Sequence, residues 1–105
     1  MSRQSIDITG PGPHVIFTPG TSEYFLAREL FLTFAHSAPT SLRVWFWSAS
    51  NLVAGPYYVT DGGQIRYKSS DSQNTYKNGP GEAFEITMDP GMSAAGTVDY
   101  EIGAL

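Results

Sequence analysis

Glycine and proline divide this sequence into short pieces, and that division constrains the fold more than any other feature. Eleven glycines and seven prolines are spread over 105 residues, in groups such as GPGP at 10–13, DGG at 61–63 and NGPG at 78–81. Groups of this kind mark turns, because glycine accepts unusual backbone angles and proline fixes its own. The sequence therefore predicts many short strands joined by turns.

Most segments between these turns alternate apolar and polar residues, as strands with one buried face do. The expected strands cover residues 4–9, 14–18, 41–48, 52–60, 64–69, 82–88 and 97–102. The first two are expected to pair with each other. Gly55-Pro56 interrupts 52–60, which predicts an edge position or a bulge because proline cannot donate to a sheet ladder.

Residues 23–36, EYFLARELFLTFAH, carry two patterns. Leu26, Leu30 and Phe34 have helical i, i+4 spacing, whereas Leu30, Leu32 and Phe34 alternate as in a strand. We expect a strand over 28–36, because aromatic residues dominate and the neighbouring segments are strands. A short helical turn near 23–27 stays open. On this strand pattern Phe25 and Phe31 fall opposite the leucines.

About eight strands at even spacing predict one all-β domain over residues 1–105, a jelly-roll-like antiparallel β-sandwich. The chain length suits a single domain. Charged residues make up only 15% of the sequence, which is less than the roughly 25% of an average globular domain. This low charge suggests that part of the surface is covered by another molecule.

Charge and hydropathy exclude several classes of partner. The net charge is −4, and the six basic residues are scattered, so direct binding of nucleic acid is not expected. No apolar stretch reaches the length of a membrane span, and the N-terminus has no apolar signal-peptide run. The absence of cysteine is compatible with cytosolic synthesis.

No catalytic or metal-binding motif accompanies the titratable residues. His14 and His36 are the only histidines, and the ten acids are spread singly along the chain. Asp71, Asn74 and Asn78 are too sparse for a calcium loop. We therefore expect no enzymatic activity, no cofactor and no metal.

The segment LRVWFW at 42–47 carries the strongest functional signal. Strand alternation puts Arg43, Trp45 and Trp47 on the face opposite the aliphatic residues. Tyr57 and Tyr58 are adjacent, so one of them is expected to point outward. Either these rings fill a second layer of core, or they form a surface that is buried only in a complex, where Trp, Tyr and Arg are enriched.

Two classes of protein use such a face. A carbohydrate-binding module stacks sugar rings on exposed aromatics, but it also needs polar partners, and the sequence places only Arg43 and Ser41 nearby. An assembly module buries the same rings against a neighbouring protein. The polar segment 69–81 is a candidate for a loop that becomes ordered on contact. The composition favours assembly.

The order of features resembles that of small β-sandwich decoration, or cement, proteins of tailed bacteriophage capsids. The resemblance covers the chain from about Phe17 onward and rests on turns and alternation. Its segments are FTPGTSEYFLARELFLTF, LRVWFWSASNLVAGPYYV, TDGGQI and GEAFEITMDPGMSAAGTVDYEI.

The resemblance implies a structural virion protein that forms a homotrimer or homodimer on the capsid surface and binds the major capsid protein to brace the head shell. It carries no catalytic residues and no fixed contact motif. Arg43, Trp45, Trp47, Tyr57 and Tyr58 are the residues that we expect to contact a partner. A tail- or fibre-associated component that binds a receptor, or a carbohydrate-binding module, is the alternative.

Overall fold

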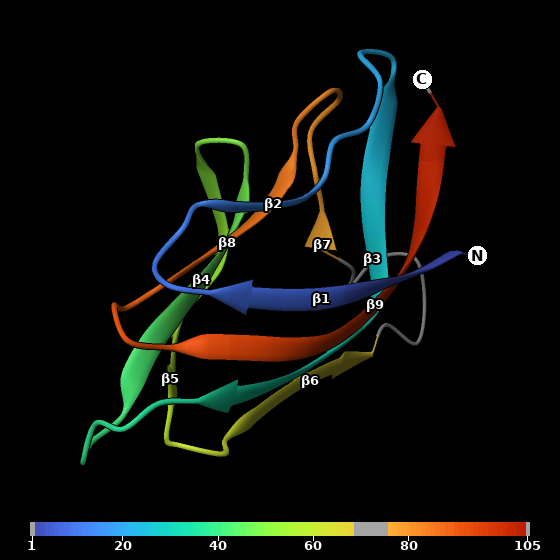
Figure 1. Ribbon diagram of the computed structural model, residues 1–105. Helices are drawn as coiled ribbons and strands as arrows, with labels where there is room; N and C mark the ends of the chain where they lie inside the picture. Colours follow the sequence, from blue (N-terminus) through green and yellow to red (C-terminus); the bar gives the residue numbers. More distant parts are fainter. Residues whose placement is uncertain (1, 69–75, 105) are drawn as a thin grey trace.

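Nine strands and no helix are formed by the residues that the computed structural model describes, 2–68 and 76–104. In chain order the strands are β1 (Ser2–Thr9), β2 (His14–Phe17), β3 (Glu23–Ala35), β4 (Leu42–Ser48), β5 (Asn51–Val59), β6 (Gln64–Lys68), β7 (Tyr76–Lys77), β8 (Phe84–Met88) and β9 (Ser93–Ala104) (Figure 1).

The strands form two antiparallel sheets. Sheet A has the order β1-β9-β3-β6, with the two-residue β7 beside β3, and sheet B has the order β2-β8-β4-β5. The pairs β1–β9, β2–β8, β3–β6 and β4–β5 are those of one long hairpin wound into two layers, which is the arrangement of a jelly roll. The predicted all-β jelly-roll sandwich is confirmed. The predicted pairing of the first two strands is wrong: they lie in different sheets, because each finds its partner near the other end of the chain.

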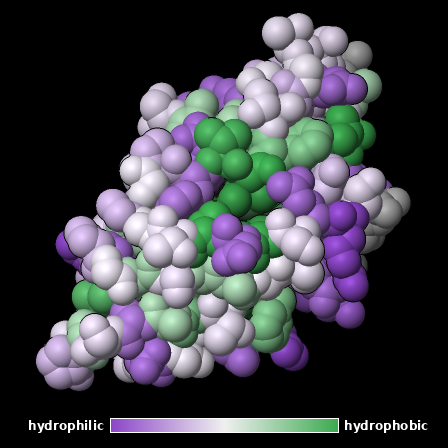
Figure 2. Space-filling view, viewed as in Figure 1, coloured by the Kyte–Doolittle hydropathy of each residue, from purple (hydrophilic) through white to green (hydrophobic). Residues whose placement is uncertain are grey.

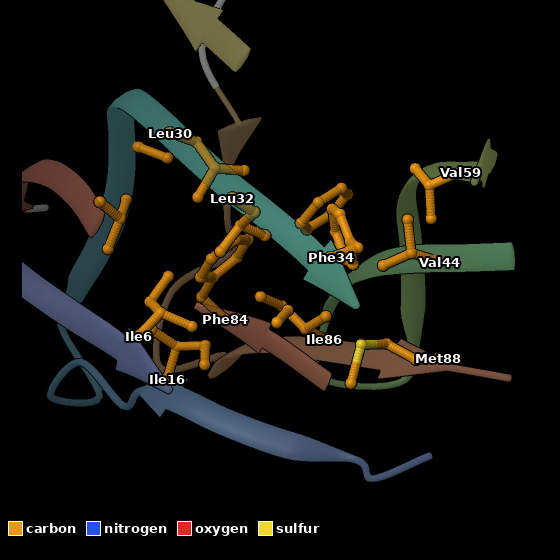
Figure 3. Packing of buried hydrophobic residues seen from close by; sticks show 14 of the residues in the cluster. Ile6, Ile16, Leu30, Leu32, Phe34, Val44, Val59, Phe84, Ile86 and Met88 are labelled. Carbon is orange, nitrogen blue, oxygen red and sulfur yellow. The ribbon is translucent and has the colours of Figure 1, made fainter. Parts of the chain in front are cut away.

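The core lies between the two sheets. Leu30, Leu32 and Phe34 of β3 point toward Phe84 and Ile86 of β8, as Figure 3 shows, and all five side chains are buried. Together these strands bury the apolar face that alternation predicts, and removal of that surface from water is the main driving force for the fold.

Aromatic rings continue this core toward the other end of the sandwich. The ring of Phe84 lies 5.1 Å from that of Phe25 and 6.1 Å from that of Phe46. Phe25 also stacks on Phe17 and Tyr100, at 5.4 and 5.1 Å. Both sheets contribute to this cluster, so the rings join the two layers.

Strand β3 contains a bulge that explains its mixed sequence pattern. Its register against β9 shifts between Ala27 and Glu29, so Arg28 is the extra residue. Phe25 and Ala27 are buried before the bulge, and Leu30 is buried after it. Leu26, the first residue of the helical i, i+4 spacing, is only half-buried and lies on the other face from Leu30 and Phe34, so that spacing does not mark one buried side. The helical turn considered for 23–27 is absent, and the placement of Phe25 opposite the leucines is wrong.

The simpler strands follow the sequence pattern. Phe84, Ile86 and Met88 of β8 are buried, and Val98 of β9 is buried on the same side as Tyr100, which packs against the core. The break predicted at Gly55-Pro56 is confirmed: β5 is an edge strand, and its register against β4 shifts twice.

Candidate functional site

The outer face of sheet A carries two ion pairs and one cation–π contact within the chain. Arg3 donates to Asp99 through Nε and Nη2, at 2.6 and 3.0 Å, and Arg28 forms an ion pair with Glu101. Phe31, the large aromatic residue near the centre of β3 on this face, has the guanidinium of Arg66 4.7 Å from its ring centre. These arginines and the Phe31 ring therefore already have partners within the chain.

The outer face of sheet B has a different character. Arg43, Trp45 and Trp47 of β4 lie there, as predicted, beside Leu52 and Tyr58 of β5, which pair with Trp47 and Arg43. Leu52 is 51% exposed and Tyr58 is 67% exposed. Residues directly opposite on antiparallel strands share a face, so these five side chains form one surface, which we call the aromatic face.

A large apolar side chain is also exposed at the other edge of sheet B, beyond the polar residues Glu85 and Thr87 of β8. Val15 of β2 pairs with Glu85 of β8 and is 58% exposed. Figure 2 shows apolar surface gathered around β2, with more polar surface on either side of it. Both edge strands of sheet B thus expose large apolar side chains.

The two tryptophans do not belong to the buried core. Both are half-buried, and the core side chains of β4 are those of Val44 and Phe46 on the opposite face. Trp47 donates its indole N–H to Thr87 Oγ1 at 2.7 Å. This bond fixes the tilt of the ring and leaves the rest of its surface available for contact.

Arg43 is held in place by Asp89. Its Nε and Nη2 donate to the two carboxylate oxygens at 3.0 Å each, and its backbone N–H donates to Oδ2 at 2.8 Å. The guanidinium carbon lies 5.1 Å from the centre of the Trp45 ring. The hydrogen bonds between the side chains raise the pKa of Arg43 and lower that of Asp89. Arg43 is thus held at the surface as half of an ion pair beside an indole ring.

Tyr57 and Tyr58 point to opposite faces, as the sequence predicts for adjacent strand residues. Tyr57 pairs with Val44 and packs edge-on against the core residue Phe46, with ring centres 5.8 Å apart. It is 38% exposed at the open edge of the sandwich. The structure therefore brings Tyr58 to the aromatic face together with Arg43 and the tryptophans, and it places Tyr57 on the inner side.

A hollow opens beside Trp47, with a volume of about 460 Å³. It is lined by Pro13, Trp47, Ala49, Ser50, Glu85 and Thr87. Sequence reasoning missed these polar neighbours, because Glu85 and Thr87 reach Trp47 and Trp45 only through the long-range pairing of β8 with β4. The alternation of EAFEITM does give a signal, since it points Glu85 and Thr87 away from the core.

The tight turn from β4 to β5 forms one rim of the hollow. Ser48 pairs with Asn51, so Ala49 and Ser50 are the two turn residues. Ala49 has a φ of 50°, in the left-handed region that a side chain with a Cβ atom disfavours. Its backbone N–H donates to Ala83 O at 2.8 Å. That hydrogen bond ties the turn to the segment that precedes β8.

The segment that precedes β8 is tied to the same hairpin by side chains. Ser48 Oγ donates to Glu82 Oε1 at 2.6 Å and accepts from Gly79 N at 3.0 Å. Asn51 donates to the other Glu82 oxygen at 3.3 Å. Within the predicted loop 69–81, residues 76–77 form β7, residues 78–81 lie next to this network, and residues 69–75 fall outside the described part of the chain.

The histidines are engaged with the backbone. His36 is buried, its Nε2 lies 3.0 Å from Val59 O, and its Nδ1 accepts from Ala38 N at 3.2 Å. His14 Nε2 lies 2.9 Å from Gly10 O. Among residues 2–68 and 76–104, no group of three His, Cys, Asp or Glu side chains is placed to hold a metal ion.

Comparison with known proteins gives no relative: no family model, no curated protein and no solved structure matches the chain. No helix that is long and apolar enough to cross a membrane occurs in the described segments.

Proposed function

We propose that this chain is a structural virion protein, a capsid decoration protein that binds the major capsid protein through the aromatic face. The observation that carries the proposal is the difference between the two outer faces. The outer face of sheet A carries charged side chains, four of which form the ion pairs Arg3–Asp99 and Arg28–Glu101, whereas sheet B presents Trp45, Trp47, Leu52 and Tyr58 outside the core.

The composition of the aromatic face matches the centre of a protein interface. Such centres are enriched in tryptophan, tyrosine and arginine, and a few of these residues supply most of the binding energy. Trp47 is fixed by Thr87, and Arg43 is fixed by Asp89, so little side-chain freedom is lost on docking. The jelly roll fits this role, since it recurs in viral capsid domains as well as in lectins.

Capsid binding by matched variants tests the proposal. The purified chain is mixed with empty capsids that lack it, and bound protein is measured by co-sedimentation. We expect the double variant Trp45→Ala/Trp47→Ala to lose at least tenfold in affinity. Phe31→Ala removes an aromatic ring from sheet A and is expected to leave affinity unchanged.

A fold check accompanies this comparison. If the double variant is unfolded by circular dichroism, Tyr58→Ala replaces it, because that side chain is 67% exposed and its loss leaves the core intact. Equal capsid binding by the wild-type chain and a folded aromatic-face variant would contradict the proposal, as would a wild-type chain that does not bind.

The hollow beside Trp47 favours carbohydrate binding as a second candidate. A half-buried indole lies next to the Glu85 carboxylate and the hydroxyls of Ser50 and Thr87, which is the pairing of stacking surface and polar groups that a sugar ring requires. Glycan-array binding that is lost in Glu85→Ala, together with no binding to capsids, would favour this candidate. Capsid binding that Glu85→Ala retains would favour the decoration protein.

A further inference from the structure

Strand β1 is the edge strand of sheet A with the least protection against further pairing. It pairs with β9 over eight consecutive residues without a register shift. The two edges of sheet B are blocked, because β5 contains Gly55-Pro56 and two register shifts, and β2 has four residues and one shift. Proline, bulges and short length are among the usual means of preventing edge-to-edge association; β1 has none of these, although it carries the charged residues Arg3 and Asp7.

The register identifies which backbone groups of β1 face outward. Gly10 N donates to Met92 O at 2.9 Å, and the pairing of Thr9 with Ser93 continues directly to this pair. Hydrogen-bonded and non-bonded pairs alternate along an antiparallel ladder. The even-numbered residues of β1 therefore bond to β9, and the N–H and C=O groups of the odd-numbered residues point to the free edge. These residues are Arg3, Ser5, Asp7 and Thr9.

The same odd-numbered residues carry their side chains on the outer face of sheet A, and all four are exposed. The inner side of β1 is already in use: Gln4 Nε2 donates to Ile16 O of β2 at 2.5 Å. Figure 1 shows β1 along the border of sheet A, next to β9 on one side only. The outer face and the free edge thus remain accessible together.

The charges on β1 are complementary to a second copy of β1. Arg3 and Asp7 are four residues apart, with Ser5 midway between them. If two β1 strands pair antiparallel with Ser5 opposite Ser5, Arg3 of each copy lies opposite Asp7 of the other. This register also places odd-numbered residues opposite odd-numbered residues, as the outward backbone groups require. Shifting it by two residues either way removes both of the opposite-charge pairs.

Arg3 can serve this contact without leaving its partner in the same chain. Its Nε and Nη2 bind Asp99, and a guanidinium has five N–H donors, so donors remain for a second carboxylate. Asp7 forms no ion pair within the described residues. The pair with Asp99 holds the guanidinium on the outer face, where Asp7 of a second copy would lie.

We infer that this chain forms a two-fold dimer in which β1 pairs antiparallel with β1 of a second copy, centred on Ser5, so that sheet A continues across both molecules. The inference does not rest on the proposed function, because it uses the opposite sheet from the aromatic face. The aromatic faces remain open in such a dimer.

Charge reversal tests the register. In Arg3→Asp both β1 charges are acidic, and in Asp7→Arg both are basic, so each variant alone places like charges opposite each other. We expect each variant to be at least tenfold weaker in self-association by analytical ultracentrifugation. Mixed in equal amounts they become complementary, and a heterodimer is expected to form. Gln64→Arg, at the opposite edge of sheet A, controls for added charge and is expected to dimerise normally.

Hydrogen exchange tests the backbone pairing. In the wild-type chain, the amides of Arg3, Ser5 and Asp7 are expected to gain protection as concentration rises. The Trp45→Ala/Trp47→Ala variant is expected to show the same gain. A monomer at all concentrations up to about 1 mM overturns the inference. So does an oligomer that persists in both charge variants, or a mixture of the two that fails to associate.

Discussion

Trp47 and Thr87 lie on neighbouring strands, 40 residues apart in the sequence, and the indole N–H of the first donates to the hydroxyl of the second at 2.7 Å. This bond connects the central strand of the aromatic face to β8, and both residues line the hollow. It is therefore one of the contacts through which changes in β8 reach the proposed binding surface, beside the backbone pairing of β8 with β4.

Replacing Thr87 with valine keeps its shape and removes the acceptor. We expect Thr87→Val to lower the free energy of unfolding by about 0.5–1.5 kcal/mol, the usual worth of one hydrogen bond. The indole should also become more mobile, which near-ultraviolet circular dichroism would detect. Thr97→Val, on the outer face of sheet A, is the matched control. Identical spectra for wild type and Thr87→Val would show that the bond does not position the ring.

Loss of a buried phenylalanine ring is expected to cost more unfolding free energy than loss of one on the surface. Phe84 is fully buried between Phe25 and Phe46, so Phe84→Ala is expected to cost about 3–5 kcal/mol of stability in urea unfolding. Phe31→Ala, which removes the same side chain from the outer face of sheet A, is expected to cost about 1 kcal/mol. Equal losses at the two positions would contradict the assignment of inner and outer faces.

The strained turn at Ala49 offers a stabilising change. A residue with a Cβ atom in the left-handed region costs about 1 kcal/mol or more, and glycine does not bear this cost. We expect Ala49→Gly to raise the unfolding free energy by about 0.5–1 kcal/mol. Ala95→Gly, in the regular part of β9, should lower it by a similar amount because glycine has more freedom in the unfolded chain. A destabilised Ala49→Gly protein would show that the turn is not strained.

Acid is expected to weaken the fold through two aspartates. Hydrogen bonds from Arg43 and Arg3 lower the pKa of Asp89 and of Asp99 in the folded state. The unfolded chain therefore takes up these protons first, near the ordinary value of about 3.9. The stabilisation is complete above that pH and is lost as pH falls through the lower folded-state pKa values.

Urea unfolding at a series of pH values measures this effect. The decline below about pH 4 should be shallower in Asp89→Asn/Asp99→Asn than in the wild-type chain. Because the arginine of each pair is exposed to solvent, the difference should shrink in about 1 M salt, where screening is nearly complete. Superimposable pH profiles for the two proteins at low salt would contradict the role assigned to the pairs.

Local alternation was sufficient to predict the fold class and most inner and outer faces. The strands around Phe84, Val98 and Trp45 each keep a period of two, so the side that a residue faces follows from its position alone. Turn residues then separated these strands correctly, including the break at Gly55-Pro56.

Long-range pairing could not be predicted in the same way. Nothing local to Asp7 or Val15 indicates that β1 pairs with β9 and β2 with β8. For the same reason the neighbours of the predicted site were missed: Asp89 is 46 residues from Arg43, and Thr87 is 40 residues from Trp47. The residues predicted for the site lie on β4 and β5, which are consecutive in the sequence, whereas Glu85, Thr87 and Asp89 come from β8 and the turn that follows it.

The bulge at Arg28 has a consequence for how this chain tolerates change in length. Before the bulge the odd-numbered residues of β3 face the core, and after it the even-numbered residues do, because Arg28 is the extra residue between them. Removal of Arg28 would give both parts one alternation, and either Phe25 and Ala27 or the buried residues Leu30, Leu32 and Phe34 would then turn toward solvent. At this position the presence of a residue matters more to the interior than its identity does, so the strand should accept many substitutions there and no deletion.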